Sequence, residues 1–128
     1  MKYMLLLYQD ESDENRTHGE PNIKSHMELA RQMVADGTYV AASPLRLTPT
    51  ATTVRVRNAS AVVTDGPFLE TKEALGGFYL LECESIDQAI AYAAKLPQAR
   101  EASVEVRPVF EIPGWDERIG LRAEEATD

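Results

Sequence analysis

Two side chains of this sequence, Asp65 and His26, have the chemistry of an acid/base pair. Asp65 follows a short apolar strand predicted over residues 61–64 and begins an Asp-Gly-Pro turn. A carboxylate at this place has two interpretations. It accepts hydrogen bonds from nearby backbone amides within the turn, or it belongs to a site at the end of the strand. The residues leave both interpretations open.

His26 lies in a helix predicted over residues 22–36 and ended by Gly37. The apolar stripe of this helix consists of Ile23, Met27, Ala30 and Val34, widened by Leu29 and Met33. At about 100° per residue, His26 falls on the same arc and faces the sheet. It is either a hydrogen-bonded core histidine or a general acid or base, because imidazole titrates near neutral pH. A carboxylate such as Asp65 within hydrogen-bond reach would fix its tautomer and raise its basicity.

Four further residues are candidates for binding a substrate: Tyr8, Ser43, Arg46 and Phe68. The charge of Arg46, or that of Lys72, suits a carboxylate group on a substrate. Each of these residues is also an ordinary strand, core or surface residue. The sequence therefore names them as candidates and leaves their roles open.

No metal and no cofactor are expected. The two histidines, His18 and His26, and the single cysteine, Cys83, argue against a zinc site. The acidic loop predicted over residues 10–20 lacks the glycine that a calcium loop needs at its sixth position. The Gly76-Gly77 pair precedes a strand and no helix start, so it does not form a phosphate-binding loop.

The composition bounds the class of protein. The chain has 128 residues and a net charge of −8, which predicts one domain and argues against nucleic acid as a direct partner. The longest apolar run, residues 3–8, is too short to span a bilayer, and the N-terminus lacks the features of a signal peptide. We therefore expect a cytoplasmic protein with no membrane partner. The lone Cys83 excludes an internal disulfide and is interpreted as a buried, inert thiol.

The predicted elements follow the βαββαβ order of a ferredoxin-like α+β fold. Strands are predicted over residues 2–9, 39–47, 75–83 and 103–112, and helices over residues 22–36 and after a capping box formed by Ser85 and Gln88. Pro44 cannot donate a ladder hydrogen bond, so its strand lies at an edge or carries a bulge. Residues 48–64 are predicted as a hairpin insert on one edge of the sheet. The domain spans residues 1–112, and residues 113–128 form an acidic appendage.

The two central strands of this order, residues 2–9 and 75–83, are apolar on both faces. The helices cover one face of such a sheet, and a large exposed apolar patch on the other face is rare in monomers. The simplest cover is a second copy of the same sheet, which predicts a two-fold homodimer packed sheet to sheet. The alternative is that the hairpin insert and the C-terminal tail fold over that face.

The sequence resembles the YCII-related or DGPF-domain family. The resemblance is carried by Asp65-Gly66-Pro67-Phe68, by Glu70, Lys72, Glu73, Gly76, Gly77 and Tyr79, and by the closing Val104-Glu105-Val106-Arg107-Pro108. It implies the fold of the dimeric α/β-barrel superfamily and hence a homodimer. It also implies a histidine and aspartate pair, which would be His26 and Asp65 here. Members of the DGPF type are associated with extracytoplasmic-function sigma factors, and no settled substrate is implied.

Three functions are compatible with these features. The first is a small-molecule pocket with cofactor-independent acid/base activity, where fold analogy suggests isomerisation, lactone chemistry or dehalogenation. The second is a ligand-binding or regulatory module that acts beside a sigma factor. The third is a purely structural dimerisation domain.

Overall fold

The structure is a computed structural model that describes residues 1–12 and 18–121. Its elements in chain order are β1 (Lys2–Gln9), α2 (Glu20–Asp36), β2 (Tyr39–Pro44), the 3₁₀ turn η1 (Thr48–Thr50), β3 (Thr52–Arg57), β4 (Ser60–Asp65), β5 (Ala74–Glu82), α3 (Ile86–Ala94), α4 (Pro97–Glu101), β6 (Ser103–Pro108) and α5 (Trp115–Arg118). Parts of the loop predicted over residues 10–20 and of the tail predicted over residues 113–128 lie outside the described residues.

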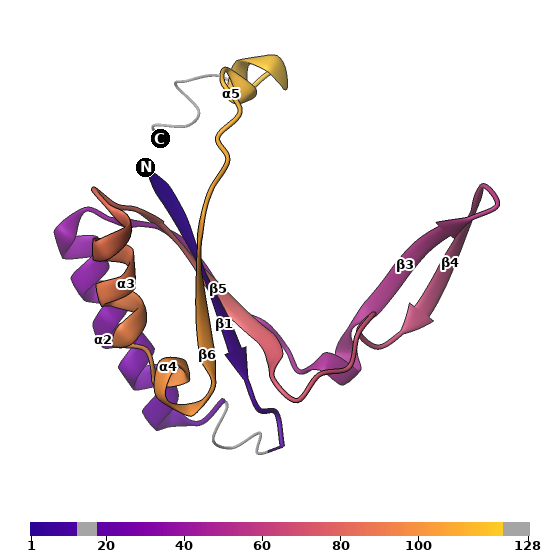
Figure 1. The fold of residues 1–128 in the computed structure, drawn as a ribbon, viewed down its shortest axis with the longest axis horizontal. Helices are drawn as coiled ribbons and strands as arrows, with labels where there is room; N and C mark the ends of the chain where they lie inside the picture. Colours follow the sequence, from indigo (N-terminus) through magenta and orange to yellow (C-terminus); the bar gives the residue numbers. More distant parts are fainter. Residues whose placement is uncertain (13–17, 122–128) are drawn as a thin grey trace.

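The body of the molecule is an antiparallel sheet of four strands in the order β2-β5-β1-β6, with the helices on one side (Figure 1). The two strands with apolar residues on both faces, β1 and β5, occupy its centre as predicted. The ferredoxin-like α+β fold expected from the order of elements is therefore confirmed. In the described residues, no helix is long and apolar enough to cross a membrane.

The core lies between the sheet and the helices. Alternate residues of the central strands point into it, including Leu5 of β1 and Leu81 of β5, and both are fully buried. Met33 of α2 and Leu96, which precedes α4, complete the set of largest fully buried side chains. This burial is what fixes the helices on the sheet, because each such side chain stabilises the fold by about 1.5–3 kcal/mol when removed from water.

The buried face of α2 differs from the predicted stripe. Leu29 and Met33, which were placed at its margin, are buried, whereas Ile23, Met27 and Val34 are exposed. Ile23 and Met27 are exposed because they line the pocket between α2 and the sheet, whereas Leu29 and Met33 pack in the core. His26 still faces the sheet as predicted, since it contacts Tyr79 of β5.

Several predicted boundaries are wrong by a few residues. The second strand ends at Pro44 and not at residue 47, and the last strand ends at Pro108 and not at residue 112. The helix that follows Ser85 ends at Ala94, before Pro97, and Pro97 begins the further helix α4, as proline commonly does at a first helical position. Ser85 caps α3 as predicted by accepting from the Gln88 backbone, while the Gln88 side chain bonds the Glu84 backbone instead of that of Ser85.

The hairpin insert is the largest departure from the prediction. Strands β3 and β4 form a separate two-stranded sheet and pair with no strand of the four-stranded one. We call residues 52–65 the arm, because it projects away from the body (Figure 1). Its turn is made by Asn58 and Ala59, both with positive φ, the conformation that suits a two-residue hairpin loop. Every arm residue except Thr53 is exposed.

Candidate functional site

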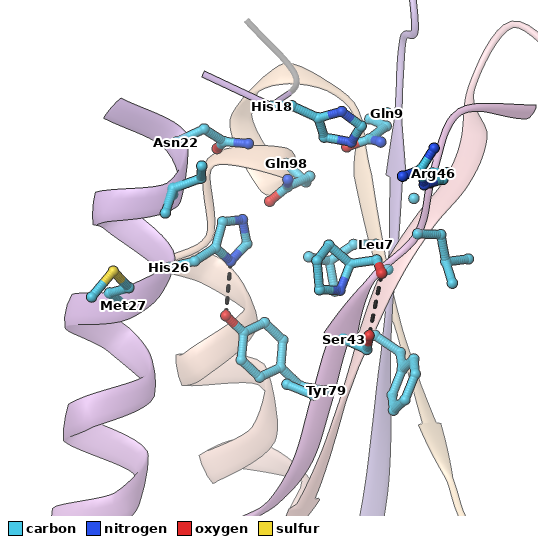
Figure 2. A pocket seen from close by; sticks show the side chains of 17 residues that line it. Leu7, Gln9, His18, Asn22, His26, Met27, Ser43, Arg46, Tyr79 and Gln98 are labelled. Atoms are coloured by element: carbon cyan, nitrogen blue, oxygen red, sulfur yellow. Dashed lines mark hydrogen bonds between the residues drawn. The ribbon is translucent and has the colours of Figure 1, made fainter. Parts of the chain in front are cut away.

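The main cavity of the described residues is a pocket of about 470 Å³ between α2 and the sheet. Its walls come from α2, from the end of β2 and the residues after it, and from the start of β5 (Figure 2). Gln98 of α4 also lines the pocket, near Asn22 in Figure 2. Most of the lining is apolar, which is typical of a site for a small organic molecule.

Two glycines at the start of β5 make room for this pocket. The register of β1 against β5 shifts between Leu7 and Tyr8, which pair with Gly77 and Leu75 and so leave Gly76 in a bulge, the feature predicted from the glycine pair. A Cβ on Gly77 would lie 3.0 Å from the Ser43 carbonyl oxygen of β2. Gly77 therefore allows the backbone of β2 to approach closely and keeps this part of the wall flat.

His26 occupies the centre of the pocket. Its Nδ1 lies 2.8 Å from the hydroxyl oxygen of Tyr79, and the two rings are nearly parallel with centroids 5.9 Å apart. Because α2 presents His26 to the sheet and β5 presents Tyr79 to α2, this hydrogen bond joins the two layers. Figure 2 shows the other ring nitrogen, Nε2, on the side of the ring that faces Gln98. Nε2 is thus the ring nitrogen left for the Gln98 amide, which raises the pKa of His26, or for a ligand between the two residues.

Burial keeps both rings neutral near pH 7. Loss of contact with water lowers the pKa of His26 below its ordinary value of 6.5, and the Gln98 amide opposes this effect in part. Burial raises the pKa of Tyr79 to about 12, with a smaller contribution from Tyr39. The hydrogen bond therefore joins a neutral phenol to a neutral imidazole, and either group can be the donor, depending on the tautomer of His26.

Gln98 is an unusual residue for an interior position. Its exposed fraction is 6%, yet its Oε1 has no hydrogen-bond partner within the described part of the chain. Buried polar atoms are normally paired, and an unpaired one costs about 1–3 kcal/mol. The Gln98 amide also raises the pKa of the neighbouring His26, so either the Nε2–H group of that imidazole or a donor group of a bound ligand would supply the missing partner. Sequence reasoning missed Gln98, because residues 97–101 gave no helical signal beyond Pro97.

The mouth of the pocket carries positive charge. Arg46 and His18 line its outer part, and both are exposed. No salt bridge or hydrogen bond of Arg46 is found among residues 1–12 and 18–121. In a chain of net charge −8, an unpaired guanidinium at a pocket mouth favours an anionic group on the ligand.

The residues singled out from the sequence fall into two groups. His26, Ser43 and Arg46 line the pocket together. Tyr8 and Phe68 lie outside its lining: the Tyr8 hydroxyl is 3.5 Å from a Glu105 carboxylate oxygen, and Phe68 is 74% exposed. Tyr79 was noticed only as part of the family pattern, and its role as the partner of His26 had no local signal.

Asp65 also lies outside the pocket lining. It is the last residue of β4, is exposed, and pairs across the arm with Thr52. Its backbone neighbour Gly66 donates to the Ala51 carbonyl and has φ of 96°, so the turn that follows the strand is present. The hydrogen bonds found for His26 and Asp65 in the described residues do not join these two side chains. The pairing of His26 with Asp65 stays a prediction.

Among the described residues, no group of three or more histidine, cysteine, aspartate or glutamate side chains is arranged to hold a metal ion. Cys83 is buried, and burial raises the pKa of its thiol. A raised pKa disfavours the reactive thiolate. The polar side chains of the pocket lining are Gln9, His18, Asn22, His26, Ser43, Arg46, Tyr79 and Gln98.

Comparison with known proteins places this fold and pocket in a family. The YCII-related domain matches residues 1–113. An uncharacterized protein of Rhizobium meliloti is 39% identical over 117 residues, an alignment that covers 85% of this chain and 92% of the relative.

A solved structure supports the fold. A 5-chloro-2-hydroxyhydroquinone dehydrochlorinase of Burkholderia phenoliruptrix, in complex with 2,5-dihydroxybenzoquinone, superposes with a TM-score of 0.52 and 15% identity over 88% of this chain and 96% of its own. At this identity the likeness shows the fold alone. With a family model that spans nearly the whole described chain and a relative that shares 39% of the aligned residues, the chain belongs to the YCII-related family.

Proposed function

We propose that the chain binds a small organic molecule in the pocket between α2 and the sheet and carries out a cofactor-independent acid/base reaction on it. One observation carries the proposal: His26 lines an apolar pocket and is held there by a hydrogen bond at Nδ1, while Nε2 lies on the side of the ring that faces Gln98, another residue of the pocket lining. A histidine that served only to fill the core would have no reason to border a cavity of about 470 Å³.

The His26–Tyr79 pair can place a proton on either side of the imidazole. When Nδ1–H donates to the Tyr79 oxygen, Nε2 carries a lone pair and acts as a base. When the Tyr79 hydroxyl donates to Nδ1, Nε2 carries the proton and acts as a hydrogen-bond donor. Because burial raises the pKa of Tyr79 to about 12, the phenol keeps its proton and serves to orient the ring. In the proposed reaction, Nε2 takes a proton from a carbon or hydroxyl group of the substrate.

The pocket indicates the class of substrate. Its apolar walls suit a compact ring or short chain, the amide of Gln98 suits a hydroxyl or carbonyl group beside His26, and Arg46 suits an anionic group at the mouth. Loss of a proton from such a molecule is the first step of isomerisation, of lactone chemistry and of elimination of halide. The name of the Burkholderia neighbour describes a dehydrochlorination, and the shared fold is compatible with a reaction of this last kind.

Asp65 is included in the proposal as a prediction from the family pattern. Its carboxylate would pair with an imidazole that is protonated during the reaction and so would raise the basicity of that imidazole. The variant Asp65→Asn separates the two interpretations. A role in the pair changes the pH dependence of turnover, whereas a role in the turn changes only the midpoint of thermal unfolding.

The proposal also includes a cytoplasmic homodimer packed sheet to sheet. The sheet face away from the helices carries Met4, Leu6, Phe78 and Leu80, which are only partly buried in the isolated chain. Apolar side chains at the centre of a sheet face favour a protein partner over water. A second copy of the same face is the partner that requires no other component.

The test is a thermal-shift screen of small acids, lactones and hydroxylated or halogenated rings, followed by turnover assays on the hits. A ligand at 100 times its Kd stabilises the folded state by about 2.7 kcal/mol, which shifts Tm by several degrees at this chain length. His26→Gln should abolish turnover, and Tyr79→Phe should lower it by about 10–100-fold, since general acid–base catalysis contributes about 100–10,000-fold.

Tyr8→Phe is the matched control for Tyr79→Phe. It removes a hydroxyl group from a neighbouring strand outside the pocket lining and should change neither ligand binding nor turnover. A ligand whose stabilising effect is the same in wild type and in His26→Gln and Tyr79→Phe would contradict the proposed site. Binding without turnover would leave a ligand-binding module as the function.

A further inference from the structure

We propose that the arm (residues 52–65) docks on a second copy of the chain, against the C-terminal segment of that copy (residues 110–121). This inference concerns an interaction surface and does not depend on the chemistry of the pocket. It rests on the apolar face of the arm, on the opposite charges of the two segments, and on the distance between them within one chain.

One face of the arm is apolar and lacks any cover in the described chain. The pairing of β3 with β4 places Val54 opposite Val63 and Val56 opposite Ala61, so these four side chains share a face. Val54, Val56 and Val63 are exposed to 62%, 64% and 62%. A two-stranded hairpin is marginally stable in water by itself, and it needs another surface against its apolar face. The arm therefore requires a partner.

The other face of the arm is mostly polar and carries two cations. Arg55 and Arg57 lie on it with Thr53, Ser60, Val62 and Thr64. The Arg57 guanidinium donates only to the neighbouring Val56 carbonyl, and neither arginine forms a salt bridge within residues 1–12 and 18–121. A ribbon of two strands is narrow, so a partner that covers the valines also meets the edges of the ribbon. The two unpaired arginines on the opposite face therefore favour a partner surface that is apolar at its centre and acidic at its rim.

The C-terminal segment has that chemistry. Phe110 is 86% exposed, and Ile112, Trp115 and Ile119 are also exposed. Between them lie the carboxylates of Glu111, Asp116 and Glu117, which with Phe110, Ile112 and Trp115 line a shallow surface hollow. Lys2 also lines this hollow and pairs with Glu111, which leaves Asp116 and Glu117 as its carboxylates without an ion pair in the described part of the chain. From residue 110 to the end of the sequence there are six acidic and two basic side chains. This segment therefore combines exposed aromatic side chains with negative charge.

The two surfaces cannot meet within one chain of this fold. The arm connects to the body where β5 begins, at the end of the sheet marked by Gln9, whereas the C-terminal segment leaves β6 at the end marked by Tyr3. At about 3.3 Å per residue these ends are about 20 Å apart, and Figure 1 shows the two segments directed away from the body along different lines. The complement of the arm therefore belongs to another molecule.

A second copy satisfies this requirement twice. In a two-fold dimer the arm of each protomer meets the C-terminal segment of its partner, so the contact is made in both directions. The docked arms would extend the sheet-to-sheet contact at its edges. They would also bury the exposed valines of the arm, which contact between the four-stranded sheets alone leaves in water. The surfaces are opposite in charge, so the docking also fixes which of the two ends of the partner the arm meets.

Charge reversal with compensation tests this docking in the full chain. Arg55→Glu with Arg57→Glu places negative charge against the acidic segment, and Asp116→Arg with Glu117→Arg places positive charge against the basic arm. Each pair should raise the dimer Kd by about tenfold or more, because like charges then face each other in both copies of the contact. The combined fourfold variant should return the Kd to within about threefold of wild type. Sedimentation velocity over a dilution series measures each Kd.

A second measurement does not depend on electrostatics. Chains carrying Val56→Cys are mixed with chains carrying Trp115→Cys and oxidised, and the docking predicts a disulfide between the two kinds of chain. The matched control uses Val40→Cys in place of Val56→Cys. Val40 is an exposed valine of β2 outside the arm, so these chains should form no such disulfide. Circular dichroism of each variant establishes that the body is folded. Three results would overturn the proposal. The wild type could be monomeric at all concentrations, or the fourfold variant could keep the raised dimer Kd of the double variants. The control chains could also form the disulfide to the same extent as the Val56→Cys chains.

Discussion

The body and the arm both contain antiparallel strand pairs, yet they are stabilised in different ways. In the body, β1 and β5 pair with their alternate side chains packed under three helices, and Leu5 and Leu81 are fully buried. In the arm, β3 and β4 pair along their whole length with almost every side chain exposed. Ladder hydrogen bonds are present in both regions, so the difference is the burial of apolar surface. The body has a hydrophobic core of its own, and the arm has none within the described residues.

The largest expected effect compares one core side chain with one arm side chain. Met33→Ala removes a fully buried side chain of α2 and should lower the free energy of unfolding by about 2–5 kcal/mol. Val56→Ala removes an exposed side chain of the arm and should change it by less than about 0.5 kcal/mol at concentrations where the chain is monomeric. Urea unfolding of the two variants measures both values. Equal losses would show that the arm is packed within its own chain.

This contrast also explains what the sequence could predict. The helical spacing of α2 correctly turned His26 toward the sheet, and the double apolar pattern correctly placed β1 and β5 at the centre. Both signals are local, because they depend on periodicity within one element. The alternation of Val54 and Val56 with Arg55 and Arg57 likewise identified an apolar face. It could not say what covers that face, because the covering surface comes from another part of the chain or from another molecule.

The site shows the same limit. His26, Ser43 and Arg46 were chosen for their residue types, and the fold brings them to one pocket. The hydrogen bond to Tyr79 and the approach of Gln98 join residues that are more than fifty positions apart in the chain. No pattern within a single element encodes such a contact. Periodicity predicts the face on which a side chain lies, and only packing decides which residue from another element meets it.

A second comparison concerns one glycine from each region. Gly77→Ala would place a Cβ 3.0 Å from the Ser43 carbonyl oxygen and 3.2 Å from Pro44 Cα, so β2 must shift and stability should fall by about 1–3 kcal/mol. Gly66→Ala, at the base of the arm, meets no atom within 4 Å but has φ of 96°, and backbone strain should cost about 1–2 kcal/mol.

The two glycine variants should differ in what else they change. Gly77→Ala alters the wall of the pocket and should weaken ligand binding, whereas Gly66→Ala should leave binding unchanged. Thermal unfolding gives the stability of each variant, and titration with a ligand from the screen gives the affinity. Unchanged affinity in Gly77→Ala would show that the flat wall formed by this glycine is not needed for the ligand.

A third comparison concerns one hydrogen bond from each region. Tyr79→Phe removes the bond to His26 inside the body and should lower the free energy of unfolding by about 1 kcal/mol, since it also leaves Nδ1 unpaired. Thr53→Val removes the bond from the Thr53 hydroxyl to the Gly66 carbonyl at the base of the arm. Water can replace that bond, so the expected loss is below about 0.5 kcal/mol. An equal loss in the two variants would argue that the pocket is as wet as the arm.

The smallest expected effect is the pH dependence of the body. Burial lowers the pKa of His26 below 6.5 in the folded state, so protonation favours the unfolded chain. The contribution of the neutral imidazole to stability is therefore fully present above pH 6.5 and is lost as the pH falls from there through the lowered folded-state pKa. His26→Gln should remove this part of the pH dependence of the free energy of unfolding. His18→Gln should retain it, because His18 is exposed at the mouth of the pocket.

Ionisation of Tyr79 should lower the free energy of unfolding at high pH. Its pKa is raised from 10.0 to about 12 in the folded state, so its contribution is present below pH 10 and is lost as the pH rises toward 12. Denaturant unfolding between pH 5 and 8, and again above pH 9, measures the two effects. Because the arm carries no histidine and no tyrosine, neither change should alter the fraction of docked arms at constant dimer concentration. A body whose stability is flat in pH, with His26→Gln identical to wild type, would mean that the imidazole is solvated and that its pocket is open to water.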